Sequence, residues 1–379
     1  MMAFANLPAT GLFVGRVWRP GIGPCLVVRR DGGLFDITTR AVPTMRDLIE
    51  LDDPAAHVAA IPGEAVGDFT LLAPPDLQAI KASGVTFAAS MVERVIEEQA
   101  AGDPDAAEAI RARIGAAIGA SLRGIRPGSP EAARVKETLL TEGLWSQYLE
   151  VGIGPDAEIF TKCQPMAAVG HGADVGLHPI SRWNNPEPEI VLAVDSRGRI
   201  KGATLGNDVN LRDVEGRSAL LLGKAKDNNA SCAIGPMIRL FDAGYGLDDV
   251  RRAELTLRVE GQDGFVLDGA SSMSQISRDP ADLVGQMIGR HHQYPDGVLL
   301  FLGTLFAPTK DRGAPGQGFT HKPGDRVIIS EPHLGVLENT VRLSTECPEW
   351  RFGTSALMRN LAGRGLIEPL APPDGTMYT

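Results

Sequence analysis

The pattern of apolar and polar residues divides the chain into three regions. Short apolar runs broken by Gly, Pro and Asp-Gly fill residues 1–80, which predicts a small N-terminal β-rich domain with strands at 11–16, 24–29 and 34–38. A segment rich in Ala, Glu and Arg follows, and its apolar residues recur with helical spacing. We expect helices there at 91–101, 104–122 and 130–147.

Beyond residue 158 the pattern returns to strands. The clearest are at 189–194, 200–206, 254–259, 297–301, 326–330 and 335–343. Runs of strands with helices inserted in one place favour an α+β, β-dominated fold over regular βαβ alternation. We therefore predict a second, larger domain over residues 86–379, with a helical lid or insertion at about 86–150.

Composition narrows the class of protein. The 44 Gly and 27 Pro among 379 residues favour a turn-rich β architecture. A net charge of −10 implies no basic face, so we expect no nucleic-acid or anionic-membrane partner. The four cysteines lie far apart, which suits neither a disulfide framework nor a zinc site. We find no signal-peptide pattern and no run of about 18 apolar residues, and we expect a cytoplasmic protein.

Candidate chemistry concentrates around one predicted hairpin. Glu187 and Glu189 are two residues apart, so both carboxylates point to the same face of an extended strand. A turn centred between Arg197 and Gly198 places Glu187 opposite Asp208 on the returning strand. Three converging carboxylates repel one another unless a cation lies between them, and oxygen-only ligands suit Mg²⁺, Mn²⁺ or Ca²⁺ rather than Zn²⁺. The alternative is a solvated strand face, because two glutamates at this spacing are common there.

An ordered set of motifs surrounds this hairpin. It comprises Phe160-x-Lys162, Gly170-His171-Gly172, Pro186-Glu187-Pro188-Glu189, Asn207-Asp208-(x)₃-Arg212-Asp213, Lys224, Cys232-x-x-Gly235-Pro236 and Gly303-Thr304. In this order the motifs resemble the fumarylacetoacetate hydrolase superfamily over roughly residues 155–345. The resemblance implies a twisted β-roll domain, Mg²⁺ held by Glu187, Glu189 and Asp208, and a homodimer or homotetramer.

The resemblance also bears on the reaction. Members that hydrolyse C–C bonds or decarboxylate usually carry a His–Glu pair upstream of the metal strand, but this chain has no histidine between His57 and His171. The segment from Ser90 to Arg94 instead resembles the branch that dehydrates 2-keto-3-deoxy sugar acids. That branch implies a metal-stabilised enolate of a 2-keto acid, formed when a C3 proton is removed, and loss of the C4 hydroxyl.

Several polar residues are candidates for this chemistry. Lys224 and Lys162 are candidate proton-transfer groups, since a lysine near a metal and buried carboxylates can have a lowered pKa; for each the alternative is a salt bridge. Glu142 and Glu150 are alternative proton shuttles in the expected lid. The candidate substrate-binding residues are Ser90, Arg94, Arg212 and Thr304. Arg212 could equally form a structural pair with Asp213, and Gly303-Thr304 could be an ordinary strand end.

The expected function is Mg²⁺-dependent dehydration of a 2-keto-3-deoxy-D-pentonate, the D-arabinonate or D-xylonate derivative, to 2,5-dioxopentanoate in non-phosphorylated pentose catabolism. One alternative is an acylpyruvate or 2,4-diketo acid hydrolase of the same fold that releases pyruvate. Another is a member without catalytic activity that only binds a ligand. The two enzymatic alternatives differ in whether a water-activating histidine or glutamate lies near the metal.

Overall fold

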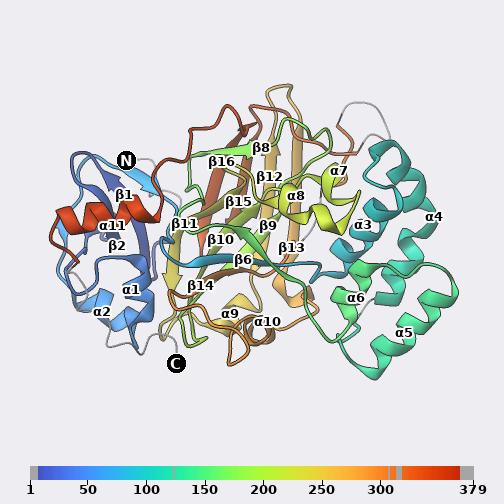
Figure 1. Cartoon of the computed structure of the whole chain (residues 1–379), viewed down its shortest axis with the longest axis horizontal. Coiled ribbons are helices and arrows are strands. Elements are labelled where there is room, and N and C mark those ends of the chain that lie inside the picture. The colour runs from blue at the N-terminus through green and yellow to red at the C-terminus, as the bar shows by residue number, and fades with distance from the viewer. Residues whose placement is uncertain (1–6, 123, 306–307, 313–317, 368–379) are drawn as a thin grey trace.

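A computed structural model describes residues 7–122, 124–305, 308–312 and 318–367. Two β-sheets form its centre, a group of N-terminal strands extends one end of the larger sheet, and a lobe of four helices lies at the other side of the molecule (Figure 1). This arrangement confirms the predicted β-dominated α+β class.

The larger sheet has eleven strands and continues from the N-terminal region into the rest of the chain. The order is β4-β3-β2-β1-β11-β10-β9-β14-β6-β7, and β5 pairs with β1. Its strands are β1 (Phe13–Arg19), β2 (Gly23–Arg30), β3 (Gly33–Asp36), β4 (Glu64–Ala65), β5 (Thr70–Leu72), β6 (Ala79–Ser83), β7 (Ile159–Cys163), β9 (Pro188–Val194), β10 (Ile200–Asp208), β11 (Cys232–Leu240) and β14 (Val298–Phe301). Because β1 pairs with β11, the strands of the predicted N-terminal domain belong to the same sheet as the hairpin that carries the carboxylates. A domain boundary near residue 80 stays a prediction.

The smaller sheet packs against one face of the larger one. Its order is β13-β12-β15-β16-β8, with strands β8 (Asp174–Leu177), β12 (Glu254–Glu260), β13 (Val266–Ser272), β15 (Arg326–Glu331) and β16 (Gly335–Leu343). On β9, Ile190 and Leu192 belong to the core shared with this sheet, while Val191 and Ala193 belong to a second core on the opposite face. Burial on both faces explains why β9 is apolar without interruption after Glu189.

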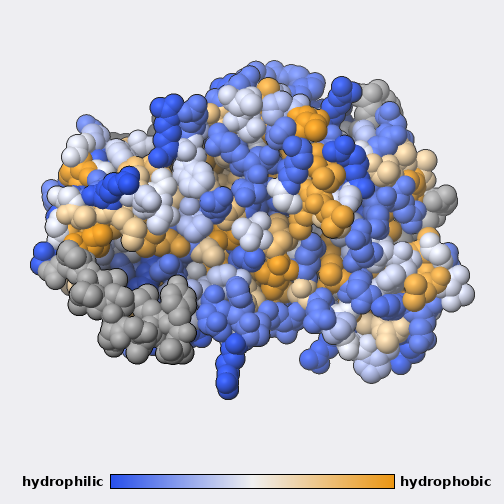
Figure 2. Space-filling model, viewed as in Figure 1, coloured by the Kyte–Doolittle hydropathy of each residue, from blue (hydrophilic) through white to orange (hydrophobic). Residues whose placement is uncertain are grey.

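Helices cover the remaining faces and ends. Helices α1 (Met45–Glu50) and α2 (Pro54–Ala60) lie beside the N-terminal strands, and so does α11 (Thr354–Gly363), drawn in red in Figure 1. Short helices connect the strands: α7 (Arg212–Glu215), η2 (Ala219–Leu221), α8 (Leu222–Lys226), α9 (Leu247–Val250), η3 (Met273–Gln275) and α10 (Pro280–Met287). No helix in the described part of the chain is long and apolar enough to cross a bilayer, and hydrophilic residues cover most of the face shown in Figure 2.

The helical lobe contains α3 (Ala88–Gln99), α4 (Pro104–Leu122), α5 (Pro130–Thr141) and α6 (Gln147–Ile153). The prediction of one helix over 130–147 is therefore wrong. The first helix ends at Thr141, and Gly143 then takes a φ of +69° that interrupts the helical path. Ser146 caps a new helix by accepting a hydrogen bond from the backbone N–H of Tyr148.

Close packing at Gly206 gives a test of this architecture. A Cβ atom there would lie 2.2 Å from Cε1 of Phe301 and 2.6 Å from Cγ2 of Val191. We expect Gly206→Ala to lower the free energy of unfolding by about 1–3 kcal/mol, measured by urea denaturation, because the core must shift to admit the methyl group. Gly285→Ala is the control: it lies on α10 with no neighbour within 4 Å, and should leave stability unchanged or slightly raised. Equal effects of the two substitutions would contradict the packing described.

Candidate metal centre and active-site pocket

The β9–β10 hairpin brings the three predicted carboxylates together. Gly206 pairs with Glu189 and Asn207 with Pro188, and the backbone N–H of Asp208 donates to the carbonyl of Glu187 at 3.0 Å. The register predicted from the sequence, with Glu187 opposite Asp208, is therefore confirmed. Alternation along the hairpin turns all three carboxylates toward one point.

The cluster formed by Glu187, Glu189 and Asp208 is compact and almost fully buried. One oxygen from each side chain lies within 4.8 Å of the others, and each residue is at most 2% exposed. Water therefore screens their mutual repulsion only weakly, and this repulsion must be offset by charges within the protein or by a bound cation. This burial also excludes the alternative of a solvated strand face.

Three cationic side chains border the cluster. Lys162 Nζ lies 2.9 Å from Asp208 Oδ1, and Lys226 Nζ lies 3.1 Å from Asp208 Oδ2 while also pairing with Glu187. Arg94 Nη2 approaches Glu187 Oε1 at 2.5 Å. Lys162 is completely buried and also donates to the carbonyl of Val209, so it fixes Asp208 relative to the backbone.

These cations stabilise the three carboxylates unequally. Burial alone would raise the pKa of Glu187, but Lys226 and Arg94 outweigh it and lower this pKa to about 2. Burial, with repulsion from Asp208 and Glu187, instead raises the pKa of Glu189 well above its ordinary value. The protein's own cations thus stabilise the negative charge of Glu187 more than that of Glu189.

The donor set fits a divalent cation. The cluster offers oxygen atoms only, which favours a hard ion such as Mg²⁺. Asp208 Oδ1 receives no hydrogen bond from the described residues although Lys162 lies close to it, so it retains a free lone pair. A divalent cation among these atoms would relieve the repulsion that raises the pKa of Glu189.

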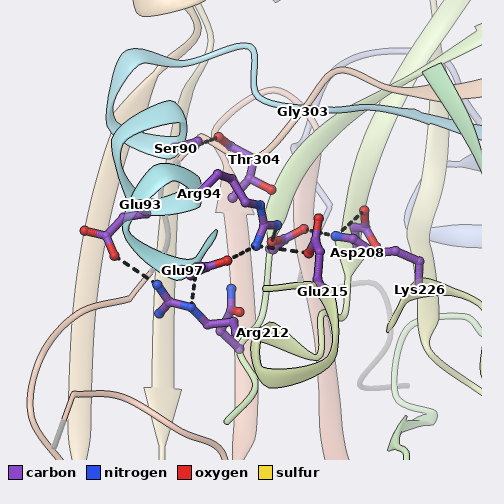
Figure 3. A network of polar contacts seen from close by, with 12 residues as sticks. Ser90, Glu93, Arg94, Glu97, Asp208, Arg212, Glu215, Lys226, Gly303 and Thr304 are labelled. Atoms are coloured by element: carbon purple, nitrogen blue, oxygen red, sulfur yellow. Dashed lines mark hydrogen bonds and ion pairs between the residues drawn. The ribbon is translucent and has the colours of Figure 1, made fainter. Parts of the chain in front are cut away.

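A narrow pocket opens beside the cluster. Strand β6, the start of β7, helix α3 and the α7–α8 region supply its walls. Its charged lining residues are Glu93, Arg94, Glu97, Glu158, Glu187, Asp208, Glu215 and Lys226, and Ser90, Phe160 and Thr304 also face it. Figure 3 shows Arg94 reaching from α3 toward the cluster, with Glu215 and Lys226 approaching from the opposite side.

Two carboxyl groups that line the pocket outside the cluster, Glu158 and Glu215, have raised pKa values. Burial raises the pKa of Glu158, and it raises the pKa of Glu215 to about 7 despite the nearby Arg94. Glu158 makes no ion pair with any residue in the described ranges, whereas Glu215 Oε2 lies 3.0 Å from Arg94 Nη1. Carboxyl groups whose pKa is raised above the ordinary value are suited to accept and return protons near neutral pH.

Of the predicted substrate-binding residues, Ser90, Arg94 and Thr304 line the pocket. Ser90 Oγ donates to the carbonyl of Thr304 at 2.5 Å, and Thr304 Oγ1 donates to Glu189 Oε1 at 3.2 Å. The backbone N–H of Gly303 donates to Glu189 Oε2 at 2.7 Å. The Gly303-Thr304 pair therefore links helix α3 to the carboxylate cluster.

Arg212 lies behind the pocket rather than in it. Its guanidinium bonds Glu97 at 2.6 Å and Glu93 at 2.9 Å, and it stacks on the Trp183 ring at 4.5 Å. Glu97 in turn pairs with Arg94 at 2.6 Å, so Arg212 acts on the cluster through α3 (Figure 3). Arg212 therefore does not line the pocket, and its contacts hold α3 instead of reaching the space predicted for the substrate. Nor does it pair with Asp213, which accepts hydrogen bonds from Ser181 and Arg182.

None of the four predicted proton-transfer residues lines the pocket, although Lys162 is buried against Asp208. The side chain of Lys224 is exposed on α8, and Lys226, two residues later, is the lysine that faces the cluster. Glu142 is exposed at the end of α5, and Glu150 pairs with Lys136 within the helical lobe. Lys226 therefore takes the place beside the cluster that was expected for Lys224, because two residues along a helix differ by about 200° in direction and so face opposite sides.

The structure adds pocket residues that the sequence analysis did not select: Glu93, Glu97, Glu158, Glu215 and Lys226. Glu97 lies four residues after Glu93 and three residues after Arg94. Side chains at these spacings are neighbours on a helix, so the sequence could have indicated this group. Glu215 follows Arg212 within the same short helix. Glu158, just before β7, stands in no recognisable motif.

Magnesium binding tests the cluster directly. We expect Mg²⁺ to raise the thermal unfolding temperature of the wild-type protein, since a ligand that binds only the folded state stabilises it. Glu189→Gln should lose this shift and remain at least as stable without metal, because the amide matches the uncharged form that burial favours. A Mg²⁺-dependent shift of wild-type size in Glu189→Gln would exclude Glu189 as a ligand.

The sequence matches a known family and two relatives of known name. Residues 151–342 match the family model described as fumarylacetoacetate (FAA) hydrolase, C-terminal. A probable 2-keto-3-deoxyxylonate dehydratase of Haloferax volcanii is 30% identical over 211 residues, which cover 56% of this chain and 68% of the relative. A 2-dehydro-3-deoxy-D-arabinonate dehydratase of Saccharolobus solfataricus is 32% identical over 188 residues, covering 49% of this chain and 58% of the relative.

Solved structures share the fold. A 2-keto-3-deoxy-D-arabinonate dehydratase in its apo form superposes with a TM-score of 0.60 at 21% identity, covering 88% of this chain and 99% of that one. A structure of 2-keto-3-deoxy-D-arabinonate dehydratase complexed with magnesium and 2,5-dioxopentanoate gives a TM-score of 0.59 over the same shares of the two chains. With the family model matching half of the sequence, these findings show that the chain belongs to the fumarylacetoacetate hydrolase family.

Proposed function

We propose that this chain is a Mg²⁺-dependent hydro-lyase that dehydrates a 2-keto-3-deoxy-D-pentonate, the D-arabinonate or D-xylonate derivative, to 2,5-dioxopentanoate. The observation that carries the proposal is the pocket in which a three-carboxylate cluster meets Lys226 and two carboxyl groups of raised pKa, Glu158 and Glu215. The names of the two curated relatives support the same reaction class. The proposed place in metabolism is non-phosphorylated pentose breakdown.

Glu187, Glu189 and Asp208 would hold the metal. When bound, Mg²⁺ would supply Lewis-acid chemistry, binding a 2-keto acid through its keto and carboxylate oxygens and making the C3 proton more acidic. Arg94, Ser90 and Thr304 border the same space. The hydroxyl protons of Ser90 and Thr304 are donated within the protein, so their oxygens would accept from substrate hydroxyls, while the Arg94 guanidinium would orient the substrate head group. Phe160 supplies an apolar wall that keeps water from the reacting carbons.

The proton transfers require one group that gains a proton and then releases it. Glu158 is our candidate, because it lines the pocket, burial raises its pKa above the ordinary value, and no ion pair to a described residue holds it in the charged form. It would take the proton from C3 and return it to the hydroxyl leaving C4 as water. Moving a proton from C5 to C3 of the resulting unsaturated acid gives an enol, which tautomerises to the C5 aldehyde.

Lys226 has a different role from the one expected for a lysine here. Burial would lower its pKa, but Asp208 and Glu187 reverse this and raise it well above the ordinary value. Lys226 therefore keeps its proton, and we assign it the donation of hydrogen bonds to the cluster and to substrate oxygens rather than the role of base.

The hydrolase alternative predicts a histidine or glutamate that activates a water beside the metal. The described residues that line the pocket include no histidine. His171 lies instead beside β16, where its Nδ1 accepts from the backbone N–H of Glu338. The two pocket glutamates from the 86–150 region, Glu93 and Glu97, are held in ion pairs with arginines. The pocket therefore lacks the histidine of the usual His–Glu pair, which supports dehydration over C–C hydrolysis.

The assay is incubation of metal-stripped protein with 2-keto-3-deoxy-D-xylonate or its D-arabinonate equivalent, with and without Mg²⁺. We expect Mg²⁺-dependent formation of 2,5-dioxopentanoate, followed through a coupled semialdehyde dehydrogenase, and no pyruvate. Pyruvate released from an acylpyruvate, with no dioxopentanoate from either pentonate, would contradict the proposal in favour of the hydrolase.

A pair of lysine variants tests the pocket assignment. We expect Lys226→Met to lower kcat by about 10²-fold or more, since a positioned donor to the reacting groups contributes about 10²–10⁴-fold. Lys224→Met, which removes an exposed charge two residues earlier on the same helix, should keep near-normal kcat and KM. Loss of activity in Lys224→Met with normal turnover in Lys226→Met would reverse the assignment.

A further inference from the structure

The pocket has few positive charges left for a ligand. Its lining contains six carboxylates and only two cations, Arg94 and Lys226. Arg111 and Arg212 pair with Glu93 from outside the pocket, and Arg212 pairs with Glu97 as well. The remaining pocket carboxylates face the two lining cations and the proposed metal.

Glu215 forms an ion pair with one of these two cations, Arg94. Arg94 Nη1 lies 3.0 Å from Glu215 Oε2, while its Nη2 contacts Glu187 of the cluster. Glu215 is 4% exposed, and its Oε2 receives no hydrogen bond from the described residues despite this ion pair. One guanidinium group therefore separates Glu215 from a proposed metal ligand, within reach of the tail of a five-carbon acid anchored at the cluster.

Apart from Arg94 and Lys226, the charged groups near Glu215 are anionic. Glu97 contacts the same Arg94, Glu158 lines the same pocket, and the buried Tyr148 lies near enough to Glu215 and Glu97 for their charges to raise the pKa of its hydroxyl further. Carboxyl oxygens of this kind bond readily to hydroxyl groups. A second ligand carboxylate would meet like charges and no unengaged cation among the described lining residues.

We propose that Glu215 makes this pocket selective for 2-keto acids with uncharged, hydroxylated tails and against 2-keto acids that carry a second carboxylate. It does so in two ways: it repels a tail carboxylate, and it engages the Arg94 guanidinium that such a carboxylate would need. The inference rests on the proposed function only in placing a 2-keto acid head group at the carboxylate cluster.

The test compares two ligands of similar length that differ in charge. 2-Oxoglutarate ends in a carboxylate, and its N,N-dimethyl 5-amide ends in an uncharged tertiary amide, which cannot cyclise onto the keto carbon. Their dissociation constants from the Mg²⁺-loaded protein would be measured by calorimetry, which needs no turnover, at pH 8, above the pKa of about 7 of Glu215. We expect the wild-type protein to bind the amide at least about tenfold more tightly, because like charges placed close together cost more than one tenfold step.

Glu215→Gln should reduce this preference by tightening the binding of 2-oxoglutarate, since the substitution removes a negative charge and releases Arg94. Glu98→Gln is the matched control: it lies on the same helix as Arg94 but bonds Gln147 outside the pocket, and it should keep the wild-type ratio. Near-ultraviolet circular dichroism would confirm that both variants fold. If Glu215→Gln does not fold, the wild-type ratio alone decides.

Equal binding of the two ligands by the wild-type protein, an unchanged ratio in folded Glu215→Gln, or no binding of either ligand would each overturn the inference. Failure of the dehydration assay is a separate result. A protein that does not dehydrate either pentonate but prefers the amide would disprove the proposed function and leave the selectivity of Glu215 standing. A protein that dehydrates a pentonate but binds both ligands equally would confirm the proposed function and disprove the selectivity of Glu215.

Discussion

Repulsion among three carboxylates shielded from water is the constraint on which the rest of this structure depends. Glu187, Glu189 and Asp208 lie within a few ångströms of one another at the end of a buried hairpin. Burial of unpaired charges is among the most costly arrangements in a folded protein. The fold offsets this cost with Lys162, Lys226 and Arg94, each from a different element, and leaves Glu189 without an ion pair to any described residue.

The same electrostatic requirement ties the helical lobe to the sheets. Arg94 reaches the cluster from α3, and Glu97 and Glu93 on that helix are held by Arg212, which lies just beyond β10. Arg212 is almost fully buried against Trp183 and Glu97, so it fixes the helix at a defined distance from the hairpin. The lobe is thus more than a cover, because it supplies one of the charges that stabilise the centre.

The sequence predicted the parts of this site that follow from strand geometry. Alternation along 187–189 and the position of the turn near Gly198 were enough to bring Asp208 opposite Glu187, since side chains on a hairpin repeat every two residues. Selection between Lys224 and Lys226 required the rotation of a five-residue helix, which no periodic pattern fixes. Glu158 enters the pocket because β7 pairs with β6, where the backbone N–H of Gly84 donates to the carbonyl of Glu158, and local sequence carries no signal of that long-range pairing. The helical lobe is also longer than the lid expected from the family resemblance. Its extra residues hide which glutamates face the pocket, so Glu142 and Glu150 were predicted in place of Glu93 and Glu97.

The most direct test of this account is anomalous X-ray scattering from crystals soaked in Mn²⁺. The account predicts a single strong peak between the carboxylate oxygens of Glu187, Glu189 and Asp208, with Lys226 and Arg94 still beside Glu187. A manganese ion bound elsewhere, with these three carboxylates paired only to the neighbouring lysines and arginine, would contradict it.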